Sequence, residues 1–197
     1  MRNRIVFLLL LISNSVRLLG QEAPPTLVKI DDSWGREIIA FPIDWAPKVA
    51  LSGYEELRFA PGWDQEAHPN FWSMVIVWNV TQQKLLTVSA IATNMKDYFD
   101  GLMKPNHWAT DFPEPSIQLE TISEENTEMT FMGTLRFFDG FHTGKLITVQ
   151  LQGSQHFCAD TDRSLVLFRM SPQTPEHDIW TTLNAIKLLP SSCEPDH

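Results

Sequence analysis

The chain has 197 residues, of which 43% are hydrophobic, and a formal charge of −9 at pH 7. This length suits one domain with a real hydrophobic core, so a second domain is unnecessary. The negative charge argues against nucleic-acid binding, since nucleic-acid-binding proteins are basic, and equally against electrostatic docking on anionic lipid.

Residues 1–20 predict a secretory signal peptide. Arg2 and Arg4 precede the apolar run 5–12, which is too short to span a bilayer. Removal of residues 1–20 takes away three of the 15 basic residues and none of the 24 acidic ones, so the charge becomes −12. Gln21 follows the expected cleavage site where a lipoprotein would carry Cys. We therefore expect a secreted or periplasmic protein that is not a lipoprotein and has no membrane span after cleavage.

The remainder predicts a leader at 21–35 and one domain at 36–197. Residues 37–43 alternate and contain Pro42, which favours an edge strand. Residues 55–60 predict a second strand, which ends at a Pro-Gly break.

Residues 71–78 form the most apolar run after the signal peptide. Both faces of this strand would be apolar, with Trp72 and Trp78 on the same face. A strand of this kind belongs in the middle of a sheet that is covered on both sides.

The next segments predict a strand at 84–93, paired with the preceding strand through a short connection, and a helix at 94–104 capped by Asn94. Four further strands are expected at 117–121, 127–138, 145–152 and 164–170, in a meander with a hairpin turn at Asp139-Gly140. A C-terminal helix should begin near Thr174 and stop at Pro190.

This order predicts an α+β fold: a single domain with a mostly antiparallel sheet of about seven strands, one inserted helix and one C-terminal helix. The element order loosely resembles PsbP-like photosystem extrinsic proteins and Mog1-like nuclear-import proteins. The stretches 56–62 and 71–78, with the two cysteines near the end, resemble secreted bacterial proteins of uncharacterised function. That resemblance implies an exported α+β protein and supplies no chemistry.

The two cysteines, Cys158 and Cys193, predict a disulfide, because an exported chain meets an oxidising compartment. The alternative is a pair of buried thiols. Neither cysteine has the partner spacing of a redox or zinc motif, so a catalytic cysteine is not expected.

Two loops, 61–70 and 105–115, carry the candidate site. They supply tryptophans, carboxylates and histidines, namely Trp63, Asp64, Glu66, His68, His107, Trp108 and Asp111. The tryptophans could stack on a sugar or another flat ligand, or could cover the core as lids. The polar groups could bind a metal or act as acid and base, yet no defined spacing supports either, so they could equally be solvated.

We therefore expect an exported binding or accessory domain that contacts an unknown small molecule, glycan or protein through these two loops. Catalytic residues, a metal and a cofactor are not expected. One alternative is a secreted metal- or carboxylate-dependent hydrolase that uses the loop acids and histidines. Another is a protein-interaction module with an exposed apolar face.

Overall fold

The computed structural model describes residues 24–104 and 113–194. The expected signal peptide and most of the loop at 105–115 lie outside these ranges. No helix in the described part of the chain has the length and apolar character needed to cross a membrane.

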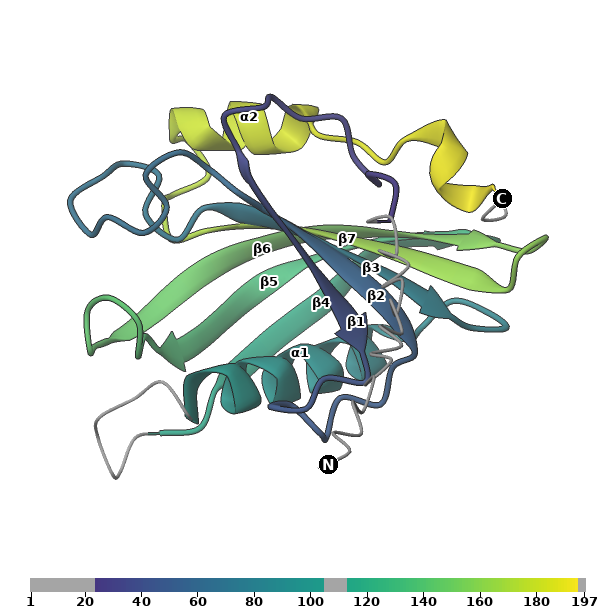
Figure 1. Cartoon of the computed structure of the whole chain (residues 1–197), viewed down its shortest axis with the longest axis horizontal. Coiled ribbons are helices and arrows are strands. Elements are labelled where there is room, and N and C mark those ends of the chain that lie inside the picture. Colours follow the sequence, from purple (N-terminus) through teal and green to yellow (C-terminus); the bar gives the residue numbers. More distant parts are fainter. Residues whose placement is uncertain (1–23, 105–112, 195–197) are drawn as a thin grey trace, which may run out of the picture.

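Seven antiparallel strands form one sheet in the order β1-β2-β3-β7-β6-β5-β4 (Figure 1). Their bounds are β1 (Gly35–Phe41), β2 (Gly53–Phe59), β3 (Met74–Thr81), β4 (Ser116–Glu125), β5 (Glu128–Phe138), β6 (Leu146–Cys158) and β7 (Arg163–Ser171). With the inserted helix and the C-terminal helix, this confirms the predicted α+β single domain.

The two helices lie on opposite faces of the sheet (Figure 1). Helix α1 (Val88–Met103) covers one face and builds the larger core, while α2 (Asp178–Ala185) covers the strands around β7 on the other face. A short 3-10 helix, Pro190–Cys193, ends the described chain. The sheet is thus the middle layer of three.

Strand β3 has the central position that its apolar sequence predicted. It lies between β2 and β7, and its residues from Met74 to Val80 are all buried. Trp72 and Trp78 lie in the α1-side core, whereas Val75 and Val77 lie in the α2-side core. The alternation of faces is confirmed, although the strand begins at Met74, three residues later than predicted.

The predicted strand at 84–93 is wrong, and so is its pairing with β3. This segment leads into α1, which begins at Val88 after Thr87 accepts a hydrogen bond from the Ala90 N–H at 3.2 Å. Asn94 is therefore inside the helix and not its cap. Its side chain accepts from the Ala50 N–H and so ties α1 to the loop before β2.

The C-terminal helix is shorter than predicted. His177 caps α2 through its side chain, which accepts from the Ile179 N–H, so Thr174 is not the capping residue. The helix ends at Ala185, before Pro190. Ile179, Trp180 and Leu183 nevertheless form the expected buried stripe.

Strands β1 and β4 are the two edges of the sheet. β1 ends at Phe41, immediately before Pro42, in agreement with the predicted edge strand. β4 is mostly exposed and carries three acidic residues, Glu120, Glu124 and Glu125. Before β1, the chain crosses the α2-side face, where Leu27 and Val28 are buried and Val28 forms an antiparallel bridge with Leu188.

Candidate functional site

An apolar cavity of about 370 Å³ lies on the α1 side of the sheet. It is bounded by strands β1 to β3, by α1 and by three loops, residues 42–52, 60–73 and 139–145. Its lining is mostly aromatic and aliphatic: Glu37, Ile39, Trp45, Leu57, Phe59, Trp63, Trp72, Met74, Ile76, Tyr98, Phe99, Leu102, Phe141 and His142. A cavity of this size and character suits a small organic molecule.

The loop between β2 and β3 folds back on itself and so brings its first and last tryptophans together. The Trp72 N–H donates to the Trp63 carbonyl at 2.8 Å. Gly62 supplies the turn with a φ of 80°, and a Cβ there would overlap the His68 ring. Glycine at position 62 is therefore required for the turn that precedes Trp63.

Trp63 is the centre of an aromatic cluster at the cavity wall. Its ring stacks on Phe59 with centroids 4.4 Å apart and meets Trp72 edge-on at 5.8 Å. His142, from the loop between β5 and β6, contacts Trp63 edge-on at 5.3 Å. Such contacts contribute stability beyond the burial of area, so the wall is preformed.

The loop at 139–145 lies at the same end of the sheet as the loop at 60–73 (Figure 1). The buried Asp139 carboxylate accepts from the backbone N–H groups of Phe141, His142 and Thr143 and thereby fixes the loop. A salt bridge of 2.9 Å between Lys145 and Glu66 joins the two loops. This turn was predicted only as a hairpin tip, and the structure makes it part of the cavity.

Trp72 combines two unusual features. Its φ of 51° lies in the left-handed region, which is costly for a non-glycine residue and is often found at functional sites. The side chain is 2% exposed, and its Nε1 donor has no hydrogen-bond partner among the described residues. A buried donor without a partner costs free energy.

Glu55 is buried behind the cavity, between strands β1 and β3. Burial raises the pKa of its carboxyl group to about 8, while hydrogen bonding by Tyr98 and Trp78 opposes the rise and the nearby charge of Glu37 adds to it. The Trp78 Nε1 donates to Glu55 Oε2 at 3.1 Å. At neutral pH Glu55 is therefore mostly a neutral acid.

Of the predicted site residues, Trp63 lines the cavity, and three others of its loop do not. Asp64 and Glu66 are exposed, and the His68 Nδ1 accepts from the Asn70 N–H. In the described part of the chain, these three residues form no group compact enough to hold a metal. The other predicted residues, His107, Trp108 and Asp111, lie outside the described ranges.

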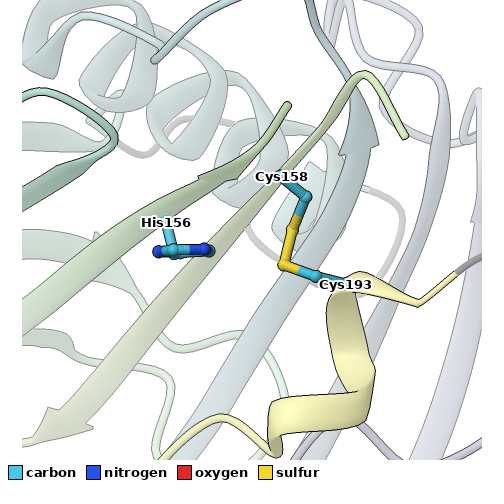
Figure 2. A group of neighbouring side chains, drawn as sticks. All are labelled: His156, Cys158 and Cys193. Atoms are coloured by element: carbon cyan, nitrogen blue, oxygen red, sulfur yellow. A yellow bond between two sulfur atoms is a disulfide. The ribbon is translucent and has the colours of Figure 1, made fainter. Parts of the chain in front are cut away.

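The predicted disulfide between Cys158 and Cys193 is present and joins the end of β6 to the C-terminal 3-10 helix. His156 lies beside it, with a ring nitrogen within 4.8 Å of both sulfur atoms (Figure 2). The sulfur atoms are bonded to each other, so neither is a thiolate that could bind a metal. This group is a structural cross-link.

Sequence reasoning missed most of the cavity. Trp72 was recognised as a core residue, but its left-handed backbone could not be predicted. Trp45 and Tyr98 come from a loop and a helix that no motif connects. The sequence did contain one indication that the loop at 139–145 belongs to the cavity, because the aromatic residues Phe141 and His142 directly follow the predicted Asp139-Gly140 turn.

No family model matches this chain, and comparison with curated proteins and with solved structures likewise gives no match.

Proposed function

We propose that this protein is an exported binding domain that takes a small, largely apolar molecule into the cavity beside Trp63. The observation that carries the proposal is the cavity itself, a preformed space of about 370 Å³ whose wall is a connected set of aromatic rings. The disulfide supports export, because such bonds persist in oxidising compartments.

The loop at 61–70 contributes to this site mainly through Trp63. Its carboxylates are exposed to solvent, and Glu66 is paired with Lys145, so we assign them no part in a reaction. The favoured role is therefore binding.

A neutral, polarity-sensitive naphthalene ketone, 6-propionyl-2-(dimethylamino)naphthalene, tests the proposal. On titration with the protein, we expect its emission to shift to shorter wavelength as the dye leaves water. The Ile39→Phe substitution adds volume to the cavity wall and should weaken binding about tenfold or more.

The matched control is Ile122→Phe on β4, where the isoleucine is 57% exposed and remote from the cavity lining. This variant should bind the dye like the wild type. If neither the dye nor a broad set of apolar molecules binds, or if the two variants behave alike, the cavity is not a binding site.

A further inference from the structure

His156 and the two cysteines of the disulfide lie together on the α2-side face of the sheet. We propose that these three residues bind one zinc ion when the cysteines are reduced, that is, before the disulfide forms or after a dithiol reductant opens it. This site lies on the other face of the sheet from the apolar cavity beside Trp63, so the inference is independent of the function proposed for that cavity.

The positions of the three ligand atoms suit a zinc ion. A ring nitrogen of His156 and both sulfur atoms all lie within 4.8 Å of one another (Figure 2). Zn–S bonds of about 2.3 Å and Zn–N bonds of about 2.0 Å put the ligand atoms of a tetrahedral zinc about 3.5–3.8 Å apart. Once the bond between the sulfur atoms is broken, rotations of the three side chains are therefore enough to surround the ion.

Strand β6 positions two of the ligands and a carboxylate beside them. His156 and Cys158 are two residues apart on β6, so their side chains project from the same face of the strand. Glu128 is opposite His156 on β5, and its Oε1 lies 3.4 Å from His156 Nδ1. A carboxylate beside a metal-binding histidine fixes the orientation of the ring and makes it a stronger donor. Glu128 thus supports His156 as a ligand.

Cys193 remains near β6 without the disulfide, because other contacts hold its segment in place. The hydroxyl of buried Ser192 donates to the Leu27 carbonyl at 3.0 Å, and the Leu189 N–H donates to the same carbonyl at 2.9 Å. Neither hydrogen bond involves a sulfur atom. The two thiols of the reduced chain are therefore held as neighbours, so little ordering of the chain opposes metal binding.

A cavity of about 620 Å³ gives an ion access to the site, because His156 and Cys193 are both among its lining residues. The side chain of His156 is 39% exposed, and Cys193 is half-buried. Three protein ligands leave one position of a tetrahedral zinc for water, as in sites where zinc keeps an open position. The cavity provides room for that water.

Opening of the disulfide takes two electrons and two protons from the dithiol, which becomes a disulfide itself, and leaves Cys158 and Cys193 as thiols. Zinc binding then displaces the two thiol protons, while His156 binds as the neutral imidazole. Two thiolates and an imidazole are donors that zinc prefers. The ion and the two thiolates together carry no net charge, so a half-buried site can hold them.

Cobalt(II) tests the site, because tetrahedral Co²⁺ bound to thiolates absorbs in the visible and near-ultraviolet far more strongly than Co²⁺ in water. The whole protein is reduced with a phosphine, kept free of oxygen, and titrated with Co²⁺ and then with Zn²⁺. We expect one tetrahedral Co²⁺ per chain with thiolate-to-metal charge-transfer absorption, which Zn²⁺ abolishes. The oxidised wild type and the Cys158→Ser/Cys193→Ser variant should not show this absorption.

His156→Gln separates the proposed site from two thiols that bind a metal without further help. It should weaken Zn²⁺ binding by the reduced chain about 100-fold or more, whereas Glu128→Gln, which alters only the supporting carboxylate, should weaken it about tenfold. The matched control is His142→Gln on the other face of the sheet, which should bind Zn²⁺ like the wild type. Circular dichroism verifies that each reduced variant is folded.

Zn²⁺ should also raise the melting temperature of the reduced wild type, because it binds the folded chain, and should leave that of the Cys158→Ser/Cys193→Ser variant unchanged. The wild-type measurements decide the question even if His156→Gln does not fold. Absence of the thiolate–cobalt absorption, or failure of Zn²⁺ to stabilise the reduced wild type, overturns the proposal. Equal Zn²⁺ affinity of folded His156→Gln and the wild type also overturns it.

Discussion

Glu55 and Glu56 are neighbours on β2 whose side chains lie on opposite faces of the sheet, and their surroundings differ completely. Glu56 is fully buried, yet it accepts hydrogen bonds from the Leu27 N–H at 2.6 Å and from Arg36 Nε at 3.0 Å. In the described part of the chain, Glu55 Oε2 accepts from the Trp78 Nε1–H, while Oε1 has no hydrogen-bond partner and no salt bridge compensates the carboxyl group. The first is a satisfied carboxylate, and the second is a carboxyl group held in its neutral form.

Glu55→Gln should therefore stabilise the protein at alkaline pH. The pKa of Glu55 is about 8 in the folded state and near 4.5 in the unfolded chain, so the unfolded chain loses its proton first as pH rises. The contribution of Glu55 to the free energy of unfolding is complete below about pH 4.5 and is lost as pH rises to about 8, by at most about 1.4 kcal/mol per unit. Urea denaturation at pH 5 and pH 8 should show the advantage of Glu55→Gln increasing by a few kcal/mol.

Glu56→Gln is the matched control with the opposite expected sign. It removes the charge that pairs with Arg36 and Arg58, whose side chains are 30% and 11% exposed, and should lower the free energy of unfolding by about 3 kcal/mol. If both variants destabilise equally at pH 8, Glu55 is ionised in the folded protein.

At the scale of elements, α1 shows what a short apolar pattern can and cannot specify. Residues 84–93 were predicted as a strand because a short connection joins them to the preceding strand. The helix prevails because Ile91, Met95 and Phe99 continue one stripe that packs into the α1-side core, and because Thr87 caps it. The helix predicted at 94–104 was correct in type, but it began about two turns too late, because α1 begins at Val88.

Thr87→Ala should lower the free energy of unfolding by about 1 kcal/mol, because the N–H of Ala90 loses its acceptor at the start of α1. Chemical denaturation measures this loss. Ser89→Ala, two residues later on the exposed side, is the control and should change stability by less than about 0.5 kcal/mol. If Ser89→Ala lowers the free energy of unfolding as much as Thr87→Ala does, the side chain of Thr87 is not the cap of α1.

The sheet was more predictable than the site because period-two alternation is a local property. Strands β4 to β7, the edge position of β1 and the burial of Trp72 and Trp78 all follow from residues close in sequence. The cavity instead depends on long-range contacts, such as Trp63 with His142, which are 79 positions apart. No local pattern encodes such a contact, so only Trp63 was anticipated among its lining residues.

At the scale of the whole molecule, the disulfide fastens the C-terminal segment to the far end of β6. It closes a loop with a sequence separation of 35, so the Cys158→Ser/Cys193→Ser double variant should lose about 3–4 kcal/mol of stability by the chain-entropy argument. Thermal denaturation of the variant and of the reduced wild type measures this. The two should agree, and a loss below about 1 kcal/mol in both would show that α2 stays docked without the cross-link.

The strand order has a consequence for how the chain assembles. β4, β5, β6 and β7 are consecutive both in sequence and in space, so each can pair with a neighbour that follows after a short turn. β3 meets β7 only after α1 and the whole meander have intervened, and that closure of a long loop carries a large entropic cost. The C-terminal four strands should thus form the folding nucleus, and the aromatic wall beside Trp63 should be completed late, when the N-terminal strands dock.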